Sequence, residues 1–142
     1  SGVKAAKREG DGATPIGRWA LREGFYRPDR MPAPATRLRM SALKPDDGWC
    51  DAPGDPNYTR PVRLPYPASH EEMWRKDGLY DVVIVMGYND APPVDGLGSA
   101  IFLHIARSDY AGTAGCVAVT LDDMMKLLAL IGPETHILVS EA

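Results

Sequence analysis

The chain has 142 residues, of which 44% are hydrophobic and 25% charged, and its formal net charge is −3. That length is enough for one domain with a core of its own. The charges are scattered and the one basic cluster, within residues 4–8, is small, so the composition does not suggest nucleic-acid binding. No apolar run approaches the roughly 20 residues of a membrane-spanning helix. We therefore expect neither nucleic acid nor a membrane span.

The N-terminal part predicts short strands separated by turns. Residues 17–22 alternate weakly and residues 36–40 alternate clearly between polar and apolar side chains, which predicts two strands. Prolines within residues 27–36 predict an irregular connection between them. With 14 glycines and 13 prolines, the chain is expected to be a mainly β domain. The abrupt start at Ser1, without a visible secretory signal, predicts one domain over residues 1–142 whose first strand or leader is missing.

Residues 44–67 are predicted to form a long loop, because they contain six prolines. Loops of this length in compact domains are usually functional or mobile. Trp49, Tyr58 and Tyr66 provide aromatic anchors, so we expect an ordered lid that closes over substrate.

Two helices are predicted in the second half of the chain. A short one near 69–75 begins with a capping box, in which Ser69 is the N-cap and Glu72 follows three residues later. The main helix covers residues 121–131 and is capped by Thr120. Its apolar face repeats at helical spacing and consists of Leu121, Met124, Met125, Leu128 and Ile131.

Four further apolar segments predict strands, of which the first two are expected to be buried. They are residues 79–86, 99–106, 117–119 and 136–140. The first is rich in β-branched side chains, and we expect both of its faces to be buried.

A histidine and a cysteine at strand ends are the residues most suited to chemistry. His104 follows the apolar run Ile101-Phe-Leu, and Cys116 follows Gly115 twelve residues further on. A cysteine attacks as the thiolate and therefore needs a proton acceptor, which a nearby histidine provides. Backbone N–H groups of residues 114–116 could stabilise the oxyanion of an acyl-transfer reaction. The residues alone leave a second interpretation open, in which Cys116 is a small core residue and His104 an ordinary hydrogen-bonding group.

Other chemistries find little support in the residues. The histidines, cysteines and acidic residues show no recognised metal-ligand spacing, there is no Gly-x-Ser-x-Gly motif, and no phosphate-binding loop is present. We therefore expect no metal and no cofactor. Two cysteines make a disulfide framework improbable, although a single Cys50–Cys116 bridge stays open at this point.

The combined order of four motifs resembles the L,D-transpeptidase catalytic domains of the YkuD family. The motifs are Gly12-Ala-Thr-Pro-Ile-Gly17, Ile101-Phe-Leu-His104, Thr113-Ala-Gly-Cys116-Val and the helix start Leu121-Asp-Asp-Met124. The resemblance extends over nearly the whole chain. It implies a β-sandwich-like fold and a cysteine enzyme of peptidoglycan biosynthesis, and hence of cell-wall organisation and cell shape, in the periplasm or cell envelope.

The resemblance also implies a mechanism and partners. Cys116 would attack the carbonyl of an L-to-D bond in a peptidoglycan stem peptide, and His104 would take and later return the thiol proton. The resulting thioester would be resolved by an acceptor amine, and Thr113, Ala114 and Gly115 would form the nucleophile loop. Members of the family are typically inactivated by carbapenems, which acylate the same cysteine.

Some positions depart from the family pattern, and other segments resemble one subgroup of the family. Most members have a second histidine where this chain has Ala114, and many have arginine or asparagine where it has Ala118. The segments Ser69-His-Glu and Gly87-Tyr-Asn-Asp90 resemble instead a short Gram-negative subgroup that forms 1,3 cross-links rather than 3,3 cross-links. We expect the 1,3 type, which joins L-alanine to diaminopimelate.

Five residues are further candidates for substrate contacts. They are His70, Tyr88, Asn89, Ser99 and Arg107, of which Arg107 could pair with a diaminopimelate carboxylate. Two other functions stay open: an L,D-carboxypeptidase, in which water resolves the thioester, and a non-catalytic wall-binding module.

Overall fold

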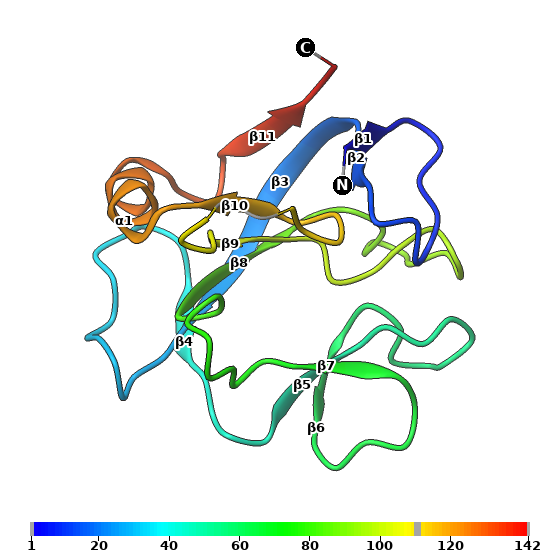
Figure 1. Ribbon diagram of the computed structural model, residues 1–142, viewed down its shortest axis with the longest axis horizontal. Coiled ribbons are helices and arrows are strands. Elements are labelled where there is room, and N and C mark those ends of the chain that lie inside the picture. The colour runs from blue at the N-terminus through cyan, green and yellow to red at the C-terminus, as the bar shows by residue number, and fades with distance from the viewer. Residues whose placement is uncertain (1, 110–111, 142) are drawn as a thin grey trace.

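A mixed six-stranded sheet forms the centre of the computed structural model, which describes residues 2–109 and 112–141 (Figure 1). Its strand order is β10-β9-β8-β3-β11, and β4 pairs with β3. The strands are β3 (Gly17–Tyr26), β4 (Met40–Ala42), β8 (Val82–Met86), β9 (Phe102–Ile105), β10 (Val117–Val119) and β11 (His136–Val139). Two smaller sheets contain β5 (Asp47–Cys50), β6 (Pro61–Arg63) and β7 (His70–Glu72) in one, and β1 (Val3–Lys4) and β2 (Thr14–Pro15) in the other.

Strand β8 divides the core into two halves because its side chains alternate between the two faces of the sheet. Val82, Ile84 and Met86 belong to a cluster with helix α1 (Leu121–Leu130). Val83 and Val85 belong to a second cluster, on the side of the β6-β5-β7 sheet. All five residues of β8 are buried, which confirms the prediction that both faces of this strand are covered.

Helix α1 confirms the main predicted helix. Thr120 caps it, and its hydroxyl oxygen accepts a hydrogen bond from the Asp123 N–H. Met124 and Leu128 are fully buried against the central sheet. Leu121 and Met125 were expected on the same buried face, but they are 42% and 38% exposed, because the face in contact with the sheet is narrower than the apolar stripe.

The short helix predicted near 69–75 is wrong, because this segment forms strand β7. The Ser69 hydroxyl donates to Asp51 at 2.6 Å instead of capping a helix. Strand β7 pairs antiparallel with β5, with Glu71 opposite Trp49. The backbone N–H groups of this segment are therefore paired within the sheet, and not with the side chains of a capping box.

The prediction of a long loop over residues 44–67 is also wrong in part. The segment contains β5 and β6, which pair with each other and, through β5, with β7. Figure 1 shows this small sheet below the central sheet. The expected aromatic anchors are present: Trp49 and Tyr58 are buried, and the Tyr66 hydroxyl donates to Asp55 at 2.6 Å.

Several strand boundaries differ from the prediction. Strand β3 continues to Tyr26 rather than ending at 22, because its second half pairs with β8 and β4. The strand expected at 36–40 begins only at Met40, because the Leu38 N–H donates to the Thr36 hydroxyl in a local turn. Strand β8 begins at Val82 rather than at 79, after a turn in which the Leu79 N–H donates to Asp77. Strand β9 begins at Phe102 rather than at 99, because Ala100 has a φ of +53° and interrupts the extended backbone.

These elements form a mainly β, sandwich-like domain, as expected. Its described residues contain one helix in place of the two that were predicted. Among residues 2–109 and 112–141, no helix is long and apolar enough to cross a membrane.

Candidate active site

His104 lies on β9, and Cys116 directly precedes the neighbouring parallel strand β10. Strand β10 begins directly after Cys116, and its register pairs Ala118 with His104 and Val117 with Leu103. Side chains two residues apart on a strand share a face, so Cys116, Ala118 and His104 point to the same side of the sheet. Cys116 and His104 line the same cavity, of about 310 Å³. The fold therefore brings together the two residues that the sequence singled out.

The Cys116 thiol is held by two backbone groups. Its S–H donates to the carbonyl of Ala100 at 3.3 Å, and its sulfur accepts from the Phe102 N–H at 3.4 Å. Burial raises the pKa of Cys116 to about 12, and the Phe102 N–H opposes that rise only in part. The thiol is therefore protonated at neutral pH, and it needs a base in order to react.

The geometry around His104 defines its tautomer. Its Nδ1 lies 2.8 Å from the carbonyl oxygen of Ile105, which accepts and cannot donate. Nδ1 therefore carries the proton and Nε2 holds the basic lone pair. The ring is 5% exposed and packs edge-on against Tyr80, with centroids 5.4 Å apart. Burial lowers the pKa of His104, so the imidazole is neutral at neutral pH.

The loop that precedes Cys116 is held by hydrogen bonds of Thr113 and by the close approach of Gly115 to Ala13. The Thr113 hydroxyl donates to the Cys116 carbonyl at 2.6 Å and accepts from the Gly115 N–H at 3.3 Å. Gly115 has a φ of +113°, and a β-carbon there would come within 2.6 Å of the Ala13 carbonyl oxygen. Only glycine fits this backbone conformation and this close approach.

The shared cavity has a basic wall. Arg75 and Arg107 both line it, together with Tyr80, Glu71, Thr113 and Ala114. The Arg75 guanidinium is anchored by Asp77, with Nε–Oδ1 at 3.0 Å, and lies over the Tyr80 ring at 5.0 Å. Arg107 is exposed.

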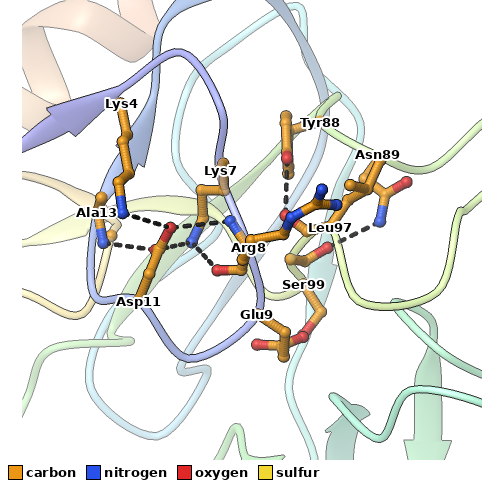
Figure 2. Close-up of polar contacts among 12 residues, drawn as sticks. Lys4, Lys7, Arg8, Glu9, Asp11, Ala13, Tyr88, Asn89, Leu97 and Ser99 are labelled. Carbon is orange, nitrogen blue, oxygen red and sulfur yellow. Dashed lines mark hydrogen bonds and ion pairs between the residues drawn. The ribbon is translucent and has the colours of Figure 1, made fainter.

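A second cavity, of about 210 Å³, also includes Cys116. It is lined by the N-terminal segment, which is fixed by ionic and hydroxyl contacts (Figure 2). The buried Lys7 ammonium lies 2.7 Å from Asp11, and Figure 2 shows the two side chains pointing toward one another. Glu9 accepts from the Ser99 hydroxyl at 2.6 Å, and the candidate residue Ser99 lines this cavity together with Cys116.

Three candidate substrate residues do not line either cavity with Cys116. The Tyr88 hydroxyl donates to the Leu97 carbonyl at 2.7 Å, and its ring packs edge-on against Trp19. Asn89 donates to the carbonyls of Val94 and Gly98, so its side chain closes a loop. His70 lies opposite Cys50 on β7, with its Nδ1 2.8 Å from the Ala68 carbonyl.

Tyr88 lines instead a larger cavity, of about 530 Å³, whose lining includes neither Cys116 nor His104. That cavity adjoins the second cavity only at Ala100.

Three residues that line the cavity of Cys116 were not predicted as site residues: Glu71, Tyr80 and Arg75. Glu71 and Arg75 fell in the segment predicted as a helix, where the face toward the cysteine could not be inferred. Tyr80 fell in a segment assigned to a buried strand. Glu71 could have been recognised as a site residue only if the pairing of β7 with β5 had been known.

Both cysteines are free, so the Cys50–Cys116 bridge that stayed open is not formed. Within the described ranges, 2–109 and 112–141, no group of three histidine, cysteine or acidic residues could hold a metal ion.

The family model of the YkuD L,D-transpeptidase catalytic domain matches residues 1–139. No curated protein and no solved structure matches the chain. Since the match extends over nearly the whole chain, the chain belongs to the YkuD family of L,D-transpeptidase catalytic domains, as the four motifs indicated. This is a family of cysteine-dependent enzymes that act on peptidoglycan.

Proposed function

We propose that this domain is a peptidoglycan L,D-transpeptidase in which Cys116 is the nucleophile and His104 the general base. The observation that carries the proposal is that His104 of β9 and Cys116, at the start of the adjacent β10, line one cavity. The Nδ1 contact to Ile105 supports the role of His104, because it leaves Nε2 as the basic atom.

The first half-reaction forms a thioester. Nε2 of His104 takes the thiol proton, and the sulfur attacks the carbonyl carbon of an L-to-D bond in a stem peptide. The carbon–nitrogen bond then breaks, and His104 returns the proton to the leaving amine. Backbone N–H groups of residues 114 and 116 stabilise the oxyanion. The Gly115 N–H donates instead to the Thr113 hydroxyl, and the contacts of Thr113 with Gly115 and Cys116 hold that loop in place.

The second half-reaction transfers the acyl group to an acceptor amine, which gives a cross-link. We propose the 1,3 type, with the L-alanine carbonyl as the acyl donor and diaminopimelate as the acceptor. Arg75 and Arg107 provide guanidinium groups in the cavity of Cys116, and these suit the carboxylates of a stem peptide. Residues 44–67 include two strands of the small sheet, and we propose that this sheet covers the bound peptide.

Two further properties follow from the proposal. Carbapenems would acylate Cys116, because they present a strained carbonyl to the same nucleophile. The domain would act in the periplasm or cell envelope, where its substrate lies.

Mass spectrometry of the protein incubated with defined tetra- and pentapeptide muropeptides tests the function. Wild type is expected to give cross-linked dimers, and fragmentation of those dimers distinguishes 1,3 from 3,3 linkage. The Cys116→Ala variant is expected to give none while its circular dichroism stays that of wild type. Shortened monomers without dimers would indicate a carboxypeptidase. No product from a folded wild type would contradict the proposal.

A further inference from the structure

Glu71 is a carboxylate at the candidate site to which the mechanism above gives no role. It lies in the middle of β7, on the small sheet, with its backbone paired to Trp49 of β5. Its Oε1 accepts a hydrogen bond from the Tyr80 hydroxyl at 3.1 Å, and the same Tyr80 ring packs against His104. The Glu71 side chain is partly buried. A carboxylate withdrawn from water at the same cavity as a nucleophile is costly, and such groups are common where an enzyme moves protons.

Glu71 lines both of the cavities that meet at Cys116. Apart from Glu71, the charged residues that line the two cavities differ in sign. The first contains Arg75 and Arg107. The second contains Glu9 and Asp51 together with Lys7, whose ammonium is already engaged by Asp11 at 2.7 Å. The second cavity therefore favours a cation, and Glu71 stands where such a cation would meet Cys116.

The transfer step requires two protons to leave the acceptor. An aliphatic amine is an ammonium ion at neutral pH and has no lone pair with which to attack the thioester. It must lose one proton before the attack and a second when the tetrahedral intermediate becomes an amide. His104 can take the second proton and pass it to the departing sulfur, but the first proton needs another base.

We propose that Glu71 binds the acceptor ammonium and takes its first proton; this inference rests on the transpeptidase function proposed above. The freed amine nitrogen attacks the thioester carbon, the new carbon–nitrogen bond forms, and the carbon–sulfur bond breaks. The second amine proton goes through His104 to the sulfur of Cys116, which ends as a thiol. Glu71 ends as a neutral carboxylic acid. Burial raises the pKa of Glu71, which makes its carboxylate a better proton acceptor than an exposed one.

The Glu71→Gln variant tests the proposal, because a glutamine oxygen still accepts from Tyr80 but cannot take a proton. Its neighbour Glu72 is exposed and lines neither cavity that contains Cys116, so Glu72→Gln is the matched control. Each protein is incubated with a tetrapeptide muropeptide as acyl donor and a diaminopimelate-containing tripeptide muropeptide as acceptor. Acyl-enzyme, hydrolysed monomer and cross-linked dimer are then measured by mass spectrometry.

Glu71→Gln is expected to form acyl-enzyme and hydrolysed monomer, while its ratio of dimer to hydrolysed monomer falls about a hundredfold, as for the loss of one general base. Hydroxylamine, which is already neutral at neutral pH, is expected to capture the acyl group at the wild-type rate. Glu72→Gln is expected to behave as wild type in all three measurements.

Two results would overturn the role of Glu71. One is an unchanged ratio of dimer to monomer in Glu71→Gln. The other is an equal loss of hydroxylamine capture, which would show that Glu71 only maintains the shape of the site. A wild-type protein that forms no acyl-enzyme would instead overturn the proposed function itself, so the two failures are distinguishable.

Discussion

The carbonyl oxygen of Ala13 occupies the space that a β-carbon on Gly115 would need, at 2.6 Å. Ala13 belongs to the N-terminal Gly-Ala-Thr-Pro segment, and Gly115 directly precedes Cys116. Two motifs that lie far apart in the sequence are therefore close together in the fold. The N-terminal segment supports the backbone of the nucleophile loop, so its position affects the position of the thiol.

Replacing Gly115 with alanine is expected to reduce acylation of Cys116 strongly. The new β-carbon would collide with a backbone atom, and a φ of +113° costs an alanine about 1–3 kcal/mol. Acylation is measured as the mass increase with a muropeptide donor, and stability by urea unfolding. Gly54→Ala is the control, because Gly54 also has a positive φ but has nothing within 4 Å of its β-carbon position. Equal acylation by Gly115→Ala and Gly54→Ala would contradict the proposed contact.

The ion pair of Lys7 and Asp11 is expected to stabilise the N-terminal segment. The Lys7 side chain is 3% exposed, so Asp11→Asn leaves a buried ammonium without its counter-ion, at a cost of about 3 kcal/mol. The surface pair of Arg63 and Asp46 is far more exposed, and Arg63→Met is expected to cost less than about 1 kcal/mol. Urea unfolding of the two variants beside wild type measures both effects.

The Lys7 contact also predicts a dependence on pH. Hydrogen bonds from Lys7 and from the backbone hold the pKa of Asp11 well below its ordinary value of 3.8. The carboxylate therefore contributes stability above that value, and the contribution is lost as the pH falls below it. The loss of stability in acid is expected to be smaller in Asp11→Asn than in wild type. An identical acid profile for the two proteins would show that the pair contributes nothing.

The elements that depend on interactions between residues close in the sequence were predicted correctly. The cap at Thr120, the apolar spacing of α1 and the apolar run of β8 each depend on neighbours in the sequence, and all three were predicted. The segment at 69–75 was not, because its capping box competes with pairing to β5, about twenty residues earlier in the chain. Sequence spacing gives no information about such a partner.

The residues of the candidate site also divide into those that sequence motifs predicted and those that depend on contacts between distant segments. Cys116 and His104 could be found because each lies beside an apolar strand and within a recognisable motif. Glu71, Tyr80 and Arg75 reach the cavity from β7 and the turn before β8, through contacts between the two sheets. His70 and Glu71 are neighbours on β7, so their side chains point to opposite faces of the small sheet. Because the segment was predicted as a helix, His70 was chosen as the candidate although Glu71 is the residue that lines the cavity.

Alkylation of Cys116 in the free protein is expected to be slow at neutral pH. Burial raises the pKa of this thiol to about 12, so only a small fraction is thiolate. The experiment uses a Cys50→Ser background, so that only Cys116 reacts with iodoacetamide. The rate is expected to rise with pH throughout the neutral and mildly alkaline range. A rate that reaches a plateau near neutral pH would indicate a preformed thiolate–imidazolium pair instead.

Acylation is expected to need neutral His104, and this sets its dependence on pH. Burial lowers the pKa of His104 below its ordinary value of 6.5, so the base is fully available at neutral pH and is lost only in more acidic solution. The acylation rate is therefore expected to fall below neutrality with a midpoint under 6.5. His104→Gln is expected to acylate about a hundredfold or more slowly, since it lacks the general base. A midpoint above 6.5 in wild type would contradict the assignment.

The same lowered pKa makes folding stability depend on pH. The unfolded chain binds a proton at His104 more readily than the folded one, so stability rises with pH across this range. The contribution of neutral His104 is fully present above its ordinary pKa of 6.5 and is lost progressively as the pH falls toward the lowered folded value. Urea unfolding from pH 7 to pH 5 measures the slope in wild type and in His104→Gln. The slope is expected to be smaller in His104→Gln, because that side chain does not titrate. An equal slope in both proteins would mean that other groups cause the acid sensitivity, and that His104 is as easily protonated in the folded protein as in the unfolded chain.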